Sequence, residues 1–433
     1  MSNVVAEMDP RLRVWRIRVF TATWMSYAFL YFCRKPFYVG KSSLEEAFGI
    51  DAQVLGWLGL SYLLAYTIGQ FVAGWTGNRW GSRVMLLVGM AVSVGCNVVF
   101  GFANSWQTMA AFLFLNGLAQ ATGWSGNVGS MAPWFHRQER GTVMGFWATN
   151  FQVGGVLANM SAAFVLGAWG WRWSFFVGSM LLSLAWVYFL FNQRNRPEDV
   201  GLPPVTGPAG PEEDHDELGL PVTEEVEIGE VDAAWTRDTR INVAVIGVFY
   251  FFVKFIRYAI WSWVPYMLYV SYGMAKDDAG YLSTIFDAAG IAGVITLGLL
   301  SDRLFRGRRA GISFVFIVGM ALSCVALYLV GPTSLVMFGL CIGLVGFTLY
   351  GPDAIMTSAG AIDVGSKRKA TLAAGIINGM GSVGAMVQEV LLGRILGDGN
   401  VAGVFATLLV SAVLAAGCLG VLLIRNRQGH ADM

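Results

Sequence analysis

Long apolar stretches follow one another along most of the 433-residue chain, each about 20 residues long, the length that crosses a hydrocarbon core as a helix. Short polar segments separate them, so the pattern predicts an all-α membrane protein with twelve transmembrane helices. Only 13% of the residues are charged, about half the share found in soluble domains, which agrees with this class. The predicted spans are residues 16–39, 54–77, 83–103, 107–132, 141–168, 173–193, 241–271, 279–300, 311–331, 334–359, 370–394 and 402–424.

One long polar interruption divides the chain. Between Pro197 and Trp235 there are twelve acidic residues and no Lys or Arg, a composition that cannot bury enough apolar surface to fold. We therefore predict an acidic cytoplasmic linker that joins two six-helix bundles. The predicted domains are an N-terminal bundle of residues 1–193, the linker 194–240 and a C-terminal bundle of residues 241–433.

The two halves repeat each other. The sequence GWTGNRWGSR follows the second span, and GLLSDRLFRGRR follows the eighth, with Arg79 and Arg303 at an offset of 224. Two arginines inside predicted spans, Arg34 and Arg257, stand at an offset of 223. Parallel repeats in secondary transporters place the substrate site at their interface near the middle of the membrane, so these arginines are candidate site residues.

The distribution of positive charge predicts the orientation. If the N-terminus is cytoplasmic, inner segments contain 21 of the 29 Lys and Arg residues, and outer loops contain four, Lys41 among them. This bias follows the positive-inside rule. We expect a multi-pass protein of the bacterial cytoplasmic (inner) membrane with both termini in the cytoplasm. No cleavable signal peptide is expected, because four arginines lead directly into a full-length span.

Two adjacent cations interrupt the first apolar run, YFCRKPFYV, at Arg34 and Lys35. On a continuous helix, Tyr27, Tyr31, Arg34 and Tyr38 would share one face, because they are spaced four, three and four residues apart. Lys35 lies beside that face near the predicted outer end. Its ammonium could reach the headgroups by snorkelling or face the site, and the sequence favours neither.

A second cationic stripe lies in the seventh span, where Lys254, Arg257 and Trp261 are spaced three and four residues apart. Arginine stays charged in a low dielectric and presents a planar fork of donors that suits bidentate binding of phosphate. Two such groups facing one cavity predict a site for phosphate or a phosphate ester, with tyrosine hydroxyls as further donors. The predicted substrate-binding residues are Arg34, Arg257, Tyr27, Tyr31, Lys254 and Lys35.

Three acidic residues also fall inside predicted spans. Asp287 and Asp353 are predicted to face the cavity, as counter-ions of the site cations or as protonatable groups that couple transport to H⁺. For Glu389 the preferred interpretation is a side chain at a helix end that reaches the headgroups.

Several motifs resemble a known family. The loop pattern G-x-x-x-[D/N]-R in both halves is similar to that of the major facilitator superfamily. The runs YAFLYFCRKPF, FIRYAIWSWVPYML, FLNGLAQATGW, LYGPDAIMT and RPEDVGLPP resemble its organophosphate:phosphate antiporter family, which includes glycerol-3-phosphate and hexose-phosphate exchangers. The resemblance implies that Arg34 and Arg257 grip phosphate, with Tyr27 and Tyr31 beside them. This sequence differs from the superfamily loop pattern at Asn78, where the pattern usually has Asp.

Further departures concern the site. The glycerol-3-phosphate members carry a histidine in the fifth span and a lysine in the second, where this sequence has Phe151 and Gln70. Lys254 stands where that subgroup has a tyrosine. The identity of the organic substrate therefore does not transfer.

Other functional classes lack support in the sequence. There is no P-loop, nucleophile motif or metal-ligand cluster, so we expect no enzymatic activity, no cofactor, no metal and no nucleic-acid partner. The expected partners are a phosphate ester, inorganic phosphate and membrane lipid, with the protein acting as a monomer. The predicted function is exchange of an organic phosphate ester for inorganic phosphate. Two alternatives stay open, a membrane sensor for a sugar phosphate and a proton-coupled organic anion transporter.

Overall fold

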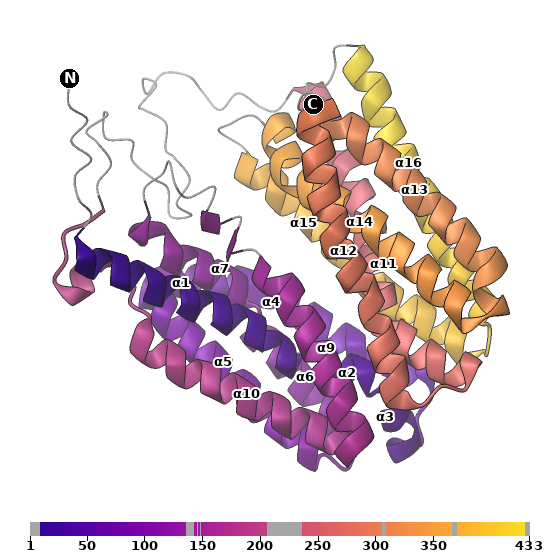
Figure 1. Ribbon diagram of the computed structural model, residues 1–433, viewed down its shortest axis with the longest axis horizontal. Coiled ribbons are helices and arrows are strands. Elements are labelled where there is room, and N and C mark those ends of the chain that lie inside the picture. The colour runs from indigo at the N-terminus through magenta and orange to yellow at the C-terminus, as the bar shows by residue number, and fades with distance from the viewer. Residues whose placement is uncertain are drawn as a thin grey trace.

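The computed structural model describes residues 9–135, 143–144, 146–147, 149–205, 236–304, 309–365 and 370–428, without the side chains of 74–78, 298, 301–310, 355 and 357–374. Most of the acidic linker and the side chains of 74–78 and 301–310, Asn78 and Arg303 included, lie outside this description. The predicted limits of the three domains therefore stay a prediction. Figure 1 shows the described helices in two groups that lie side by side, one indigo to magenta and the other orange to yellow.

The helices of each group follow the predicted spans closely. The first group contains α1 (Pro10–Leu30), η1 (Tyr31–Cys33), α2 (Lys35–Val39), α3 (Lys41–Phe48), α4 (Ala52–Trp80), α5 (Ser82–Phe102), α6 (Trp106–Gln120), α7 (Thr122–Met131), η2 (Ala132–Trp134), α9 (Thr149–Trp169) and α10 (Trp171–Asn192), followed by η3 (Pro197–Val200). The second group contains α11 (Arg237–Tyr272), α12 (Lys276–Leu304), α13 (Arg309–Val330), η4 (Gly331–Thr333), α14 (Leu335–Gly365), α15 (Ala370–Gly397) and α16 (Val401–Arg427).

Ten helices in the described part of the chain are long and apolar enough to cross a membrane. The segments predicted as the first and fourth spans are also helical, but each is interrupted. The first changes from α1 to α2 through η1, and the fourth is divided between α6 and α7 at Ala121. The prediction of an all-α membrane protein is confirmed, whereas the assumption of one continuous helix through Tyr38 is wrong.

Proline explains the interruption of the first span. Pro36 has no backbone N–H, and its ring would clash with the carbonyl one turn earlier in a continuous α-helix. Side-chain amides occupy two of the carbonyls near the break. Asn97 and Asn116 each donate to the Cys33 carbonyl over 3.1 Å, and Gln120 donates to that of Leu30 over 3.1 Å. Polar side chains of α5 and α6 thus replace the missing helical hydrogen bonds.

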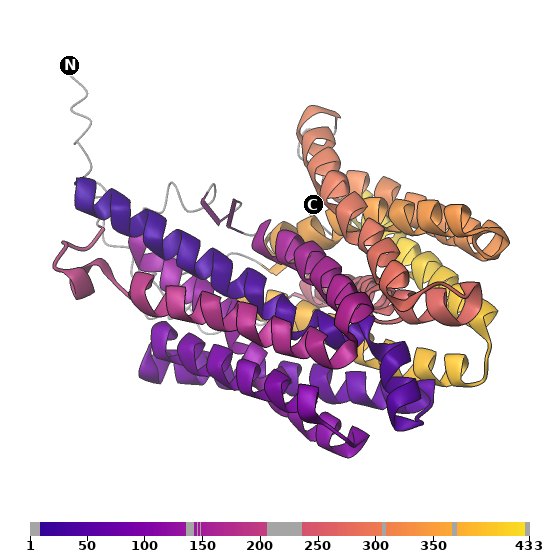
Figure 2. The ribbon, with the colours of Figure 1, turned by 60° about the horizontal axis from the view of Figure 1, so that its bottom comes forward.

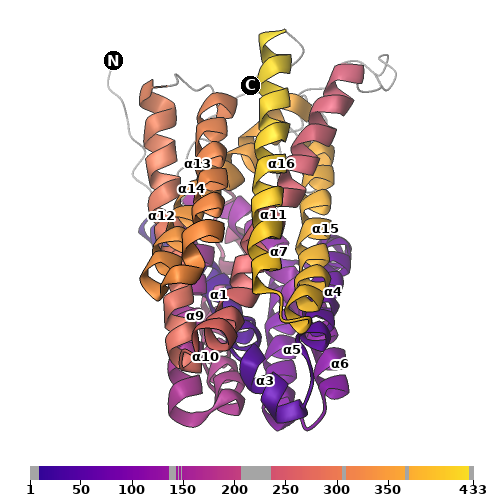
Figure 3. The ribbon, with the colours of Figure 1, turned by 90° about the vertical axis from the view of Figure 1, so that its right-hand side faces the viewer.

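The short helix α3 was not predicted. The sequence analysis placed Lys41 in an outer loop, but it begins α3 and is completely buried. Both Figure 1 and Figure 3 place α3 at the end of the molecule opposite the two chain termini. We call this the α3 end.

The two bundles touch through helices from both halves. Helix α4 packs on α15, and α9 packs on α12. Figure 2 shows the same two groups of helices after a turn of the molecule. Asn159 of α9 crosses the interface and donates to the Gly280 carbonyl and the Ser283 hydroxyl of α12, over 2.8 and 2.9 Å. This interface therefore combines close helix packing with polar contacts.

Close packing within the second bundle generates a prediction about Gly293. A Cβ atom there would overlap the backbone carbonyl of Phe347, which cannot move aside as a side chain can. Gly293→Ala should therefore lower the stability of the protein in detergent by about 1–3 kcal/mol. Gly95→Ala is the matched control, because a Cβ there meets nothing within 4 Å and alanine favours a helix by up to about 1 kcal/mol. Equal melting temperatures for the two variants would contradict the packing described here.

Candidate anion-binding site

The Arg34 guanidinium lies in an aromatic cradle. Its Nε atom donates to Gln120 Oε1 over 2.9 Å, and Tyr62 donates to the same oxygen over 3.0 Å. The guanidinium carbon lies 4.8, 5.6 and 5.2 Å from the ring centroids of Tyr31, Tyr62 and Tyr66. Arg34 is only 7% exposed. Its contacts in the described part of the chain come from a neutral amide and aromatic rings, so they leave its positive charge uncompensated.

The break in the first span positions this arginine. Arg34 links η1 to α2, and its backbone N–H closes the turn of η1 by donating to the Tyr31 carbonyl over 3.0 Å. Gln120 binds both the break and the cation, because its amide group donates to the Leu30 carbonyl while its oxygen accepts from Arg34. Sequence reasoning did not select Gln120. The available signal was a primary amide within an apolar span, where an unpaired polar group is costly.

Arg257 has a different environment in the second bundle. Its guanidinium forms a short ion pair with Asp353 of α14, next to Pro352, and lies over the rings of Tyr258, Trp261 and Tyr350 at 5.3, 5.2 and 5.9 Å. The structure thus brings together the predicted counter-ion and the predicted phosphate ligand. Among the described residues, the two repeat-related arginines differ because a carboxylate neutralises Arg257 and none pairs with Arg34.

Lys35 links the two bundles. Its ammonium lies 3.4 Å from Asp287 of α12 and 4.3 Å from the ring centroid of Trp261 of α11. Asp287 also accepts hydrogen bonds from the Trp261 indole over 2.6 Å and from the Tyr350 hydroxyl. With Lys35 only 1% exposed, snorkelling to the headgroups is ruled out in this conformation.

Lys254 lies one turn before Arg257 in α11 and contacts neutral groups. Its ammonium donates to Asn378 over 2.8 Å and to Ser382 over 3.5 Å, both on α15, and lies 4.9 Å from the Tyr250 ring centroid. These partners leave its charge available to an anion, and their side chains could accept or donate further hydrogen bonds.

Two aromatic rings connect the cations of the two bundles. Tyr31, beneath Arg34, meets Trp261, beside Arg257, edge to face at 6.2 Å between ring centroids. Tyr27 lies behind Tyr31 at 6.0 Å between ring centroids, and it also packs against Trp124 and Trp147 at 5.5 and 5.9 Å. The structure therefore brings Tyr27, Tyr31, Arg34, Lys35 and Arg257 together around the Tyr31–Trp261 contact, whereas Lys254 has its contacts with Tyr250 and α15.

The site carries a formal excess of positive charge. It contains three buried cations, on Arg34, Lys35 and Lys254, a fourth on the partly buried Arg257, and two buried carboxylates, on Asp287 and Asp353. The excess of two matches the charge of a phosphate dianion. An anion of that charge could bind without deprotonation of any site cation.

The interpretation of Glu389 as a helix-end residue that reaches the headgroups is wrong. The side chain is completely buried, and it forms an ion pair with Lys41 of the other bundle at 2.9 Å. Sequence analysis missed the pair because its members are 348 residues apart. Hydropathy along the chain gives no information about a partner at that separation.

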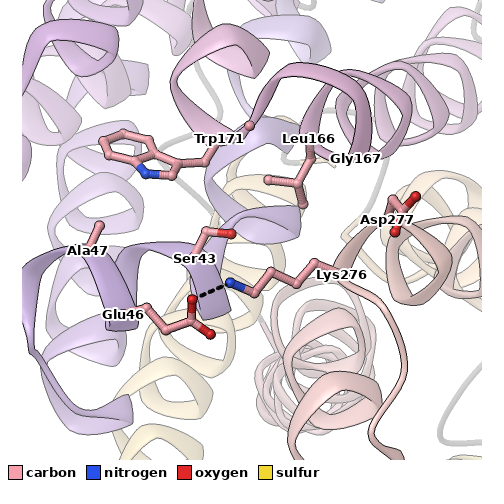
Figure 4. A pocket seen from close by; sticks show the side chains of 9 residues that line it. Ser43, Glu46, Ala47, Leu166, Gly167, Trp171, Lys276 and Asp277 are labelled. Atoms are coloured by element: carbon pink, nitrogen blue, oxygen red, sulfur yellow. Dashed lines mark hydrogen bonds and ion pairs between the residues drawn. The ribbon is translucent and has the colours of Figure 1, made fainter.

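A cavity of about 460 Å³ lies between the bundles at the α3 end, away from the arginines. Figure 4 shows the Glu46–Lys276 ion pair in its wall, with Trp171 on the other side. The ion pair measures 2.5 Å and is partly exposed. Hydrogen bonds from Lys276 and Tyr269 hold the pKa of Glu46 below its ordinary value, so the pair is intact at neutral pH. Since its lining includes Asp277 as a second carboxylate, this cavity suits an anion less well than the arginine site does.

Comparison with known protein families accounts for the two-bundle architecture. A family model for the Major Facilitator Superfamily matches residues 23–224 and 243–432, which is most of the chain. The chain belongs to the major facilitator superfamily. Members of this superfamily are transporters rather than enzymes, and the protein is accordingly a multi-pass membrane protein.

Relatives over most of the chain include proteins named as transporters of hexose phosphate and glycerol-3-phosphate and one named as a membrane sensor. The chain is 26% identical over 414 residues to a probable hexose phosphate transport protein of Chlamydia pneumoniae, covering 94% of this chain and 90% of that protein. It is 27% identical to the membrane sensor protein UhpC of Escherichia coli, with coverages of 95% and 92%. It is also 27% identical to the glycerol-3-phosphate transporter of Bacillus subtilis, with coverages of 95% and 93%.

A solved structure shares the superfamily fold. It is a bacterial homolog of the human lysosomal transporter Spinster in an inward-facing, unoccupied conformation, with a TM-score of 0.73 and 15% sequence identity. The alignment covers 99% of this chain and all of the other. The predicted resemblance to this superfamily is confirmed by both sequence and fold.

The buried Lys35–Asp287 pair generates a stability prediction. Asp287→Asn keeps a hydrogen-bonding side chain for Trp261 and Tyr350 but leaves the Lys35 ammonium buried without a carboxylate. Losing one member of a buried pair typically costs about 3–5 kcal/mol, so the melting temperature in detergent should fall clearly. The double variant Lys35→Met/Asp287→Asn should recover part of the loss. Asp398→Asn, an exposed carboxylate, is the control, and an equal melting temperature for Asp287→Asn and this control would contradict the pairing.

Proposed function

We propose that this protein exchanges an organic phosphate ester for inorganic phosphate by alternating access. The observation that carries the proposal is the pair of repeat-related arginines, one from each bundle, that meet at the Tyr31–Trp261 contact. Their forked donors suit tetrahedral oxyanions, and the names of the relatives point to the same chemical class.

The unequal partners of the two arginines suggest an order of events. An incoming phosphate group first meets Arg34, whose cradle supplies no carboxylate to compete with it. It then displaces Asp353 from Arg257, because a dianion offers two charges where the carboxylate offers one. Both arginines now hold a single anion, which draws the bundles together around it.

Exchange follows from the electrostatics of the empty site. When the anion leaves, the excess positive charge repels itself in a low dielectric, so closure of the empty carrier is costly. A bound phosphate dianion removes that cost. The carrier therefore changes its orientation only when loaded, which couples the outward movement of phosphate to the inward movement of the ester.

The proposed orientation places both termini in the cytoplasm and the protein in the cytoplasmic membrane. The bundles touch at the α3 end, opposite the termini, through the Lys35–Asp287, Lys41–Glu389 and Glu46–Lys276 pairs. With this orientation the α3 end is the outer face, and the contacts describe a carrier closed to the outside. Substrate binding from the cytoplasm would begin the reverse movement.

A second candidate function is sensing of a sugar phosphate. Its support is the similarity to the membrane sensor protein UhpC, which is as extensive as the similarity to the transporters. A sensor could use the same arginines to bind its ligand without rapid turnover. The two functions differ in whether bound ligand crosses the membrane.

The arginine assignment predicts the outcome of charge-conserving substitutions. Arg34→Lys and Arg257→Lys keep the positive charge but lose the forked donors, so each should weaken phosphate binding and slow exchange at least about tenfold, or roughly 1.4 kcal/mol. The measurement is uptake of labelled phosphate into phosphate-loaded proteoliposomes, normalised to the amount of protein inserted. Arg172→Lys, a substitution outside the site, serves as the matched control. Near wild-type exchange in either site variant would refute the assignment.

The exchange mechanism predicts a strong dependence on the opposite side of the membrane. Proteoliposomes loaded with labelled phosphate should release it slowly into phosphate-free buffer and at least about tenfold faster when external phosphate or hexose phosphate is present. A panel of phosphate esters in the outer buffer then identifies the preferred substrate. Equal release under both conditions would indicate a uniporter or ion-coupled carrier. Ligand binding without any release would favour the sensor.

A further inference from the structure

A second set of buried charges lies between the bundles, separate from the arginine site. Lys41 of α3 and Glu389 of α15 form an ion pair at 2.9 Å, and both side chains are fully buried. Ser262 of α11 lies between them. Its hydroxyl accepts from the Lys41 ammonium over 2.6 Å and donates to Glu389 Oε1 over 2.5 Å.

The hydrogen-bond and ion-pair partners described for the Lys41 ammonium come from the second bundle, while the first bundle contributes the more distant rings of Phe37 and Tyr38, at 5.6 and 5.9 Å. Besides Ser262 and Glu389, the ammonium lies 3.3 Å from the ring centroid of Trp263. Lys41 itself belongs to the first bundle. Separation of the bundles at this end would therefore remove the partners of this cation, and the partner of Glu389, in one movement.

Glycines make room for the Glu389 carboxylate. A Cβ atom on Gly59 of α4 would lie 2.5 Å from Glu389 Cδ and 2.6 Å from Oε2. Gly393, one turn after Glu389, approaches the Ala52 carbonyl so closely that its own Cβ would lie 2.8 Å away. The carboxylate thus sits in a recess of α4 that exists because Gly59 has no side chain.

One short run of α11 touches both sets of charges. Trp261 contacts Lys35, Arg257 and Asp287, and the next two residues, Ser262 and Trp263, contact Lys41. A shift of α11 caused by anion binding at Trp261 would be transmitted directly to Ser262. This connection gives the ion pair a place in the transport cycle.

We propose that Lys41, Ser262 and Glu389 form a lock that holds the α3 end closed and must open in every transport cycle. The three are positioning residues that act through the relative placement of the bundles and have no contact with the substrate. A buried charge without its partner is costly, so the pair holds the bundles together. The bundles can separate only when water hydrates both Lys41 and Glu389. The inference rests on the alternating access proposed above. It identifies the separation of Lys41 from Ser262 and Glu389 as a barrier to the opening of the α3 end.

Gly59→Ala provides a direct test, because the added methyl group displaces only the flexible end of Glu389 and should leave the fold intact. The readout is the distance between spin labels on Gln107→Cys and Asp398→Cys, exposed positions at the α3 ends of the first and second bundles, in a Cys418→Ser background. In reconstituted protein without substrate, the parent should show mainly the short distance of the closed end. Gly59→Ala and Lys41→Met/Glu389→Gln should each increase the long-distance population at least about threefold.

Two controls separate the lock from general perturbation. Gly95→Ala makes the same substitution where a Cβ meets nothing within 4 Å, and Glu46→Gln removes the partly exposed Lys276 pair at the same end, which should contribute little. Both controls should keep the distances of the parent. Parent-like distances in Gly59→Ala, with the protein eluting as folded, would overturn the lock whether or not the double variant folds. Because these distances are measured without substrate, failure of phosphate exchange in the parent would refute only the proposed function.

Discussion

The absence of water from the membrane interior is the constraint on which the rest of the site depends. A backbone carbonyl released by the break at Pro36 has to find a donor within the protein. Asn97, Asn116 and Gln120 supply these donors, and Gln120 also holds Arg34. The irregular backbone and the cation beside it are therefore stabilised by one hydrogen-bond network, so the break cannot be straightened without disturbing the arginine.

The two bundles differ in how they stabilise a buried guanidinium. The first uses the faces of three tyrosine rings, which attract the cation without neutralising it. The second uses Asp353, which does neutralise it. An aromatic cradle keeps its cation available to a ligand at all times, whereas a carboxylate releases its partner only in competition. The two repeat-related arginines thus differ, because Arg34 keeps its charge uncompensated by the described residues while Asp353 neutralises that of Arg257.

Sequence alone predicted the helices and the intramembrane charges, because both depend on local properties. The predicted spans overlap all ten membrane-length helices in the described part of the chain, and the repeat offset singled out Arg34 and Arg257. The break before Pro36 and the pairing of Lys41 with Glu389 were not predicted. Pro36 was a local signal for the break, but the amides that satisfy the freed carbonyls, like the Lys41–Glu389 pair, could be identified only from the packing of the helices. The hydrophobic periodicity of one segment gives no information about either set of partners, since both depend on contacts between helices distant in the chain.

The length of α11 has a consequence for the lipid around the protein. Its 36 residues extend about 54 Å, while the hydrocarbon core is about 30 Å thick. Part of the helix therefore lies outside the hydrocarbon core, and Asp238 near its start is paired with Arg425 of α16 at 2.6 Å. A thicker bilayer would cover more apolar helix before it reached this pair. The second bundle can therefore adapt to membranes of different thickness without desolvating its terminal charges.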